Sequence, residues 1–380
     1  MKIRSITCFV DPRNDPEGRL VSHLAEFCNE AIQKLSTRSV EVESTRLSSP
    51  PFTQIAATGD FRSSLNFALT FQAQATENGF AYASCGPTLP EDQMDGENLA
   101  ALLREAGDCF FGTVIADSRF IYPAAIKTAA RTIKEASTIT PDGFANLRFA
   151  ALANTAAYGP FFPGSYGVLN EKPAFSLAIE CADAFLAAFQ TDAPLAQQRI
   201  TLVATLENFA ATLSNTLDPL AERYGLDFKG FDFSPAPYPE PGCSLGGAIE
   251  ALGTGLGKFG AVAGAAVIAS TFQQGKWRHT GYNGLMLPVM EDALLAQRAA
   301  EGQLTIQDLL LYSSVCGTGL DTVPLPGDVS TAELESILWD VAALAVRLGK
   351  PLTARLMPIP GRHAGEATAF DFGYFQNSRI

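Results

Sequence analysis

The chain has 380 residues, of which 47% are hydrophobic and 18% are charged. This composition is typical of a folded protein and excludes a disordered one. The 27 Lys and Arg residues against 40 Asp and Glu give a net charge of −13. A surface of that sign repels nucleic acid and anionic membranes, so we expect neither as a partner.

Nothing in the sequence indicates a membrane span or an oxidising compartment. The most apolar stretch, residues 259–272, is 14 residues long, whereas a membrane helix needs about 20. Residues 1–11 lack the long apolar core of a signal peptide. The seven cysteines are scattered without a C-x-x-C pair, which is typical of reduced, mostly buried thiols. We therefore expect a cytoplasmic protein.

Strands and helices alternate along the chain. A strand rich in Ile, Val and Thr at 2–10 precedes an amphipathic helix at 16–36, in which apolar residues recur at spacings of three and four. Further strands are predicted at 40–46, 80–85, 109–115, 147–153, 175–181, 229–233, 284–288, 320–325, 352–358 and 369–375. Further helices are predicted at 60–77, 96–106, 123–136, 195–224, within 245–273, 305–315 and 331–348.

This alternation favours a parallel sheet covered by helices. The strands are apolar enough to be buried on both faces, as in such sheets. About ten candidates are too many for a comfortable open sheet, but they suit a closed or nearly closed α/β barrel. No segment has the composition of a linker, so we predict a single α/β barrel domain over residues 1–380.

The loop at 158–167, YGPFFPGSYG, is unusually apolar for a connection. Phe161 and Phe162 at its centre are predicted to bind a ligand, as part of a pocket wall or lid. Two other interpretations stay open. The loop is a hydrophobic plug in one, and a contact between subunits of a homo-oligomer in the other.

Asp232 and Ser234 lie at the end of the predicted strand 229–233. Ligands of α/β proteins gather at the carboxyl ends of strands. Asp232 is therefore a candidate catalytic residue and Ser234 a candidate ligand-binding residue. The alternative is a turn in which the carboxylate accepts hydrogen bonds from backbone N–H groups.

Residues 242–247 and 253–257 are rich in glycine, but they lack the strand and the spacing of a dinucleotide fingerprint, and no P-loop occurs. We expect no nucleotide cofactor. The cationic segment 275–284 contains His279, the best acid–base candidate of the three histidines. We predict that His279 binds a ligand, the alternative being a solvated loop.

Four carboxylates stand out in the last hundred residues. Glu291 and Asp292 are adjacent at a predicted helix start, and Asp321 and Asp328 follow Cys316. Gathered in one site, they could perform acid–base chemistry or bind a divalent cation. We assign Glu291 and Asp321 to catalysis, and Asp292 and Asp328 to ligand binding. The alternative for the first pair is favourable charge at a helix N-terminus.

Cys316 is a candidate catalytic nucleophile or a residue that shapes a pocket. It follows an apolar helical tract at 309–315 and precedes Gly317, as a core cysteine at a helix C-terminus would. The helix dipole at that end disfavours a thiolate. The spacing shows no Cys-His-Asn arrangement.

Five groups of residues, in order along the chain, resemble an uncharacterised prokaryotic family, DUF-711. They are Ser5–Thr7 with Asp11-Pro12, Asn154 with Phe161–Gly167, Asp232–Pro237, Asn283-Gly284 with Pro288–Asp292, and Val315–Asp321 with Pro326–Asp328. The last group is the most specific, and His279 lies outside the pattern.

The resemblance implies a fold related to pyruvate formate-lyase, a ten-stranded α/β barrel of the glycyl radical enzyme type. It does not imply radical chemistry, because no Arg-Val pair precedes Gly373-Tyr374 as it does the radical glycine of those enzymes. No catalytic residue is carried over from the family.

We therefore expect an enzyme of unassigned reaction that acts on a small polar metabolite, with carboxylate and Cys chemistry in the barrel mouth at the carboxyl ends of the strands. Its cofactor stays open, with a divalent cation as one candidate. The rival interpretations are a non-catalytic protein for metabolite binding or assembly and, least favoured, a radical enzyme.

Overall fold

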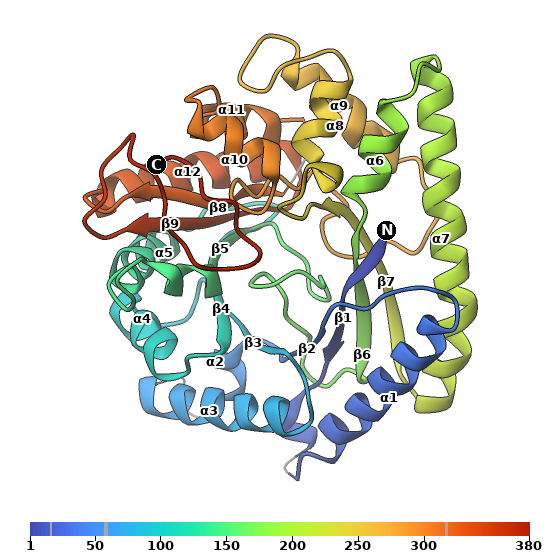
Figure 1. The fold of residues 1–380 in the computed structure, drawn as a ribbon. Coiled ribbons are helices and arrows are strands. Elements are labelled where there is room, and N and C mark those ends of the chain that lie inside the picture. The colour runs from blue at the N-terminus through green and yellow to red at the C-terminus, as the bar shows by residue number, and fades with distance from the viewer. Residues whose placement is uncertain (16, 57–59, 316–317) are drawn as a thin grey trace.

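Figure 1 shows the fold of the computed structural model, which describes residues 1–15, 17–56, 60–315 and 318–380. Its strands are β1 (Lys2–Phe9), β2 (Thr45–Ser48), β3 (Tyr82–Thr88), β4 (Cys109–Ala116), β5 (Phe149–Ala153), β6 (Ala174–Glu180), β7 (Asp227–Ala236), β8 (Gly319–Pro326) and β9 (Leu352–Ile359).

Helices occupy most of the connections, and several begin at side-chain caps. Ser330 and Glu333 form a capping box at the start of α12, and Asp60 accepts from Ser63 N at the start of α3. The helices are α1 (Arg19–Ser36), α2 (Phe52–Ile55), α3 (Phe61–Glu77), α4 (Gly96–Glu105), α5 (Pro123–Ala136), α6 (Ala182–Phe189), α7 (Leu195–Tyr224), α8 (Leu245–Ala251), α9 (Ala261–Phe272), α10 (Ala293–Ala300), α11 (Ile306–Ser313) and α12 (Thr331–Leu348). Short 3-10 helices lie at Pro12–Asn14, Phe144–Arg148 and Pro241–Cys243.

The described strands form one strongly curved sheet in the order β7-β6-β1-β2-β3-β4-β5-β9-β8 (Figure 1). The strands β1 to β5 are parallel neighbours. At the two ends of this group β6 joins β1 and β9 joins β5, both antiparallel. β7 and β8 are parallel to β6 and β9. The prediction of a wholly parallel sheet is therefore wrong at two joints, and the sheet consists of two groups that run in opposite directions.

The described strands leave the sheet open between β7 and β8, so the predicted ten-stranded barrel is not confirmed. The segment 279–288 makes one parallel bridge to each of these edges, Phe231 with His279 and Pro288 with Asp321. The strand predicted at 284–288 is thus reduced to a bridge. Pro288 has no N–H to donate, which suits an isolated bridge better than a continuous ladder.

The strand predicted at 369–375 is wrong, since the chain there forms turns and irregular structure. Its expected hairpin partner, β9, already pairs with β5 on one side and β8 on the other. The segment instead packs Phe370 and Phe375 into a small apolar cluster with Met290 and Met357.

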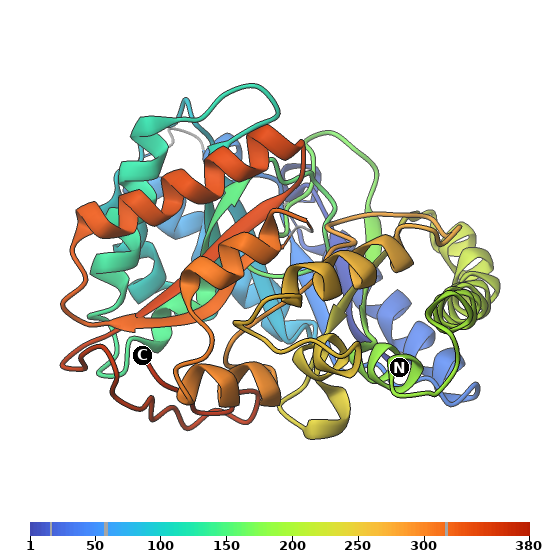
Figure 2. The same cartoon turned by 90° about the horizontal axis from the view of Figure 1, so that it is seen from above.

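The two faces of the sheet differ in chemistry. In β1, Ile3, Ile6 and Cys8 belong to the apolar core between the sheet and the surrounding helices. Figure 2 shows one of these helices, α12, lying along β9 on the outside of the sheet. Ser5 and Thr7 of β1 instead contact the loop on the inner face. Beyond the register shift at Ile3 and Ser5, alternation along β1 therefore directs apolar side chains to the outer core and hydroxyl groups to the inner loop.

The loop 158–167 lies inside the curved sheet, within the connection from β5 to β6 (Figure 1). Hydroxyl groups of the surrounding strands hold it: Thr7 Oγ1 donates to Pro160 O (2.9 Å), and Ser84 Oγ donates to Ser165 O (2.8 Å). Phe162 is only 8% exposed. The loop thus fills the sheet from within, and it lacks the exposed surface from which a subunit contact was predicted.

No helix in the described part of the chain is long and apolar enough to cross a membrane.

Candidate functional site

A cavity of about 190 Å³ lies inside the curved sheet, against the inner loop. The first group of strands contributes residues near their amino ends, whereas β7 contributes Ala236 at its carboxyl end. β8 and β9 contribute Asp321, Thr353 and Arg355. The expectation of a site at strand carboxyl ends assumed one strand direction. Because the two groups run in opposite directions, the cavity gathers the amino ends of the first group and the carboxyl end of β7, whereas β8 and β9 contribute from their amino-terminal halves.

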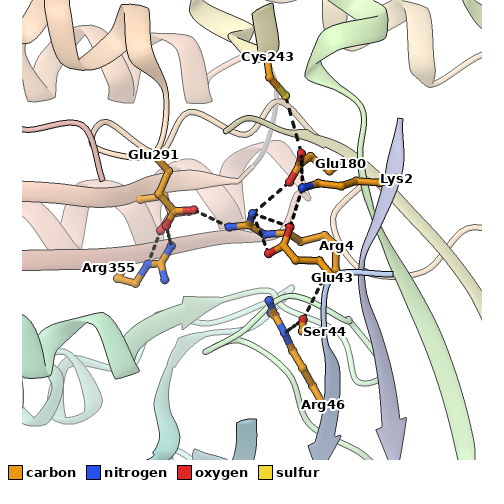
Figure 3. Close-up of polar contacts among 10 residues, drawn as sticks. Lys2, Arg4, Glu43, Ser44, Arg46, Glu180, Cys243, Glu291 and Arg355 are labelled. Atoms are coloured by element: carbon orange, nitrogen blue, oxygen red, sulfur yellow. Dashed lines mark hydrogen bonds and ion pairs between the residues drawn. The ribbon is translucent and has the colours of Figure 1, made fainter. Parts of the chain in front are cut away.

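Arg4 joins three carboxylates beside the cavity (Figure 3). It sits in β1 where the pairing with β6 shifts in register, between Ile3 and Ser5. Its Nη1 lies 3.1 Å from Glu43 Oε1 and 3.0 Å from Glu180 Oε2, and its Nη2 lies 3.3 Å from Glu291 Oε2. Its guanidinium also lies 4.8 Å from the centre of the Tyr374 ring. Both Nη groups of Arg4 are therefore paired with carboxylates, although the side chain also lines the cavity.

Arg355 extends this network to β8. Its Nη2 lies 2.8 Å from Glu291 Oε1, and its Nε lies 2.6 Å from Asp321 Oδ1. Glu291 thus accepts from one arginine at each carboxylate oxygen and links the two groups of strands. Burial raises the pKa of Glu291, an effect that Arg355 opposes and the charge of Asp321 reinforces.

Glu180 lies at the other end of the network, at the carboxyl end of β6. Lys2 Nζ approaches Glu180 Oε1 at 3.4 Å and Glu43 Oε2 at 3.2 Å. Burial raises the pKa of Glu180 to about 7, although Arg4 and Lys2 act to lower it. This carboxyl group therefore changes charge near neutral pH.

Arg46 lies next to this network without joining it (Figure 3). Its Nε donates to Ser44 Oγ at 3.1 Å, and no carboxylate of the described residues forms an ion pair with it. The centres of the Tyr82 and Phe162 rings lie 5.6 Å and 5.3 Å from its guanidinium. Arg46 is 9% exposed and lines the cavity.

Aromatic side chains form much of the remaining wall. Phe161 and Phe162 of the inner loop line the cavity, as the prediction of a pocket wall requires. Tyr282 also lines it, and burial raises the pKa of its hydroxyl, although a side-chain hydrogen bond with Thr155 acts to lower it.

Asp232 and Ser234 are fully buried and do not line the cavity. Asp232 Oδ1 accepts from Ser234 Oγ (2.6 Å), and Asp232 Oδ2 accepts from Tyr282 N (2.7 Å). Ser234 Oγ accepts from Gly284 N at 3.1 Å. Both side chains thus tie the segment that carries Tyr282 to β7, which corresponds to the turn alternative.

Asp292 is a buried cap for two helices. Its Oδ1 accepts from Leu294 N and Leu295 N at the start of α10. Its Oδ2 accepts from Leu245 N and Gly246 N at the start of α8. All its hydrogen bonds go to the protein, and it does not line the cavity.

Three other predicted residues contribute no described atom to the cavity. His279 stacks on Trp277 and contacts Gly275 O at 3.1 Å. Asp328 is exposed beside His363, 3.3 Å away. Cys316 lies outside the described residues. Of the four carboxylates expected together, the fold joins only Glu291 and Asp321, through Arg355.

Within the ranges that the structure describes, no group of three or more His, Cys, Asp or Glu side chains is arranged to hold a metal ion. The carboxylates beside the cavity are bound to Lys or Arg instead. These paired carboxylates and cations can bind charged groups and transfer protons.

The family model "Uncharacterised ACR (DUF711)" matches residues 1–371. The chain belongs to the DUF711 family. The resemblance predicted from the sequence motifs is thereby confirmed.

Relatives of this DUF711 chain carry the name UPF0210 protein, which states no activity. One from Pyrobaculum arsenaticum is 34% identical over 251 residues, or 64% of this chain and 55% of the relative. One from Methanopyrus kandleri is 31% identical over 297 residues, or 73% of this chain and 61% of the relative. One from Actinobacillus succinogenes is 26% identical over 382 residues, or 96% of this chain and 84% of the relative. The chain thus spans a little over half the length of the first of these relatives.

The sequence interpretation missed the three arginines of the site, Arg4, Arg46 and Arg355. A signal was present, because each lies in a predicted strand or at its end, among apolar residues. A charged side chain inside a buried strand needs a partner, and such a residue marks a polar interior.

Proposed function

We propose that this DUF711 protein is an enzyme that moves a proton on a small polar metabolite held in the cavity, with Glu291 as the acid–base group. The observation that carries the proposal is the position of Glu291. It lines the cavity, its side chain is only 13% exposed, and its pKa is raised. General acid–base groups work best when their pKa is near the working pH.

Asp321 is the second carboxylate of the proposed reaction. It lines the cavity and shares Arg355 with Glu291. A substrate that replaces one of these ion pairs would bring Glu291 into contact with its reacting proton. Cys316 stays a sequence-based proposal as a nucleophile, and Thr318, two residues further on, lines the cavity.

We also propose that the sheet acts as a ten-stranded barrel of the pyruvate formate-lyase type, with 279–288 as its tenth element. The backbone supports this closure on both sides. Thr280 N donates to Phe231 O (3.1 Å) beside β7, and Val289 N donates to Asp321 O (3.1 Å) beside β8. Closure would shield the cavity from water on that side.

Proton transfer can be tested without knowing the full reaction. The protein is incubated with small metabolites in D₂O, and NMR follows the replacement of carbon-bound hydrogen by deuterium. We expect exchange with the wild type and a loss of about 100-fold or more in Glu291→Gln, because the amide cannot accept the proton. Asp328→Asn, which changes an exposed carboxylate, is the matched control and should keep wild-type exchange.

The other outcomes separate the rival interpretations. Full exchange in Glu291→Gln overturns the role of Glu291. Loss of exchange in Cys316→Ser, with Glu291→Gln unaffected, assigns the chemistry to the thiol. Binding of a metabolite without any exchange or turnover favours the non-catalytic metabolite-binding protein.

A further inference from the structure

We infer that Arg46 is the anchor for a single carboxylate group, and that the natural ligand is a small monocarboxylic acid. This inference rests on the proposed function, in which the cavity binds a metabolite, and it names the chemical class of that metabolite.

The contacts of the cationic side chains distinguish Arg46 from its neighbours. Arg4 is bound by three carboxylates, and Arg355 is bound by two. Arg46 donates from Nε to Ser44, and none of the described carboxylates accepts from its two Nη groups. Those groups form the edge of the guanidinium that matches a planar carboxylate with two parallel hydrogen bonds.

Arg46 does not avoid the cost of a buried, unpaired charge by losing its proton. Burial lowers the pKa of Arg46 to about 10, with the charge of Arg4 adding to the effect, so the guanidinium is still cationic at neutral pH. A buried charge without a partner is costly, and proteins retain one where it has a use. An anion in the cavity would supply the missing partner.

The aromatic rings beside Arg46 cover the faces of its guanidinium group, so an anion can bind only at the edge of that group. Tyr82 and Phe162 lie against the guanidinium in cation–π geometry, at 5.6 Å and 5.3 Å. Ser44 takes the Nε position. The ligand therefore approaches from the cavity toward the Nη groups.

The charge balance favours a monoanion over a phosphate dianion. Leaving aside the exposed Glu41, which lies 3.9 Å from Lys2, the network and Arg46 together carry four cations and four carboxylates: Lys2, Arg4, Arg46 and Arg355 against Glu43, Glu180, Glu291 and Asp321. One added negative charge can be offset by a proton on Glu180, whose pKa is about 7. A second negative charge would stand against the remaining carboxylates.

The size and lining of the cavity narrow the ligand further. A volume of about 190 Å³ is below the roughly 300–1,000 Å³ of pockets that hold drug-sized ligands, which suits a small molecule. Tyr282 lines the cavity, and its hydroxyl, next to Thr155, can donate a hydrogen bond to a second oxygen of the ligand. A short hydroxy or oxo acid fits these features.

Binding measurements on the whole chain test the inference. Short monocarboxylates, including acetate, glycolate, lactate and pyruvate, are titrated calorimetrically against the wild type, together with their amides and inorganic phosphate. We expect at least one carboxylate to bind ten-fold or more tightly than its amide and than phosphate. Arg46→Gln should weaken that binding ten-fold or more, whereas Arg131→Gln, at an exposed arginine of α5, should leave it unchanged.

A second variant guards against misfolding of the first. Arg46→Lys keeps the charge but cannot bind a carboxylate with two parallel hydrogen bonds, so we expect a loss of several-fold with an unchanged circular dichroism spectrum. Carboxylate binding that is equal in the wild type, Arg46→Gln and Arg46→Lys overturns the inference. So does phosphate that binds as tightly as any carboxylate.

The same titrations separate this inference from the proposed function. If neutral amides or alcohols bind in the cavity and undergo hydrogen exchange while carboxylates do not bind, the anion anchor is wrong and the enzyme proposal stands. If no small molecule of either class binds, both are wrong.

Discussion

Arg46 is buried without an ion-pair partner among the described residues, and this makes a stability prediction possible. We expect Arg46→Met to raise the free energy of unfolding of the ligand-free protein by about 1–3 kcal/mol, because an apolar side chain of similar length avoids the burial of a lone charge. Urea unfolding followed by circular dichroism measures the change.

The control is Arg355→Met, which removes a paired arginine. It should lower the free energy of unfolding by about 3–5 kcal/mol, because Glu291 and Asp321 lose their shared cation. If Arg46→Met loses stability to the same extent, Arg46 is a structural residue rather than a ligand anchor.

Glu180 gives the stability a dependence on pH. Its pKa in the folded chain is about 7, raised by burial from 4.5. The folded state therefore binds this proton more tightly than the unfolded state does. The contribution of Glu180 to stability is fully present below about pH 4.5 and is lost as the pH rises through 7.

We expect Glu180→Gln to remove this dependence. The stability of the variant relative to the wild type should increase from pH 5 to pH 8 by up to about 3 kcal/mol, since each pKa unit corresponds to about 1.4 kcal/mol. Unfolding curves at the two pH values measure the difference. A relative stability that falls with rising pH would mean that pairing with Lys2 and Arg4 outweighs burial.

The sequence indicates which residues are acidic or nucleophilic, but it does not indicate which partners the fold gives them. Glu291 and Asp321 were named as candidate site residues, and both line the cavity, but the arginine that joins them was not named. Asp232 and Asp292 resembled site residues equally well, yet the fold uses them to accept backbone N–H groups. In the sequence, a carboxylate near a turn or a helix start looks the same whether it lines a binding site or accepts hydrogen bonds from backbone N–H groups.

Among the helices, Asp292 accepts backbone hydrogen bonds from the starts of both α8 and α10. We expect Asp292→Ala to lower the free energy of unfolding by roughly 2–5 kcal/mol, because it uncaps two helices and leaves buried N–H groups without acceptors. Thermal unfolding measures the loss. Asp328→Ala, at an exposed position, should change the stability by less than about 0.5 kcal/mol; equal losses in the two variants would contradict the capping role.

Strands that alternate with helices were predicted well, because the apolar composition of each strand can be seen within its own segment of the sequence. Eight of the eleven predicted strands overlap observed strands well. They are 2–10, 80–85, 109–115, 147–153, 175–181, 229–233, 320–325 and 352–358. The prediction at 40–46 overlaps poorly, because β2 begins at Thr45. The failures at 284–288 and 369–375 depend on what surrounds the segment. At 369–375 no edge of β9 was free to accept another strand.

At the scale of the whole molecule, the direction of the strands decides where the site lies. The connection from β5 to β6 contains no helix, so it cannot serve as the usual crossover between parallel strands. That connection instead enters the interior and supplies Phe161 and Phe162 to the cavity. Residues 154–173 contain no helical segment, and this feature of the sequence could have indicated the reversal of strand direction. The ion-pair network across the antiparallel pairs could not be predicted, because it depends on side chains that only the fold brings together.

The network spans both groups of strands, from Lys2 in β1 to Asp321 in β8. Arg4 and Glu291 join its two halves through one ion pair. Opposite strand directions thus place charged side chains from distant parts of the sequence around one cavity. The fold in this way creates a polar interior that no single motif encodes.

A crystal structure of the protein with the monocarboxylate that binds most tightly would test the anion-binding role of Arg46 at the atomic level. We expect the carboxylate to make two hydrogen bonds to the Nη groups of Arg46, beside Tyr82 and Phe162, with the rest of the ligand directed toward Glu291. A ligand bound outside this cavity, or an Arg46 that is paired with a protein carboxylate while the ligand is bound elsewhere, would contradict this role.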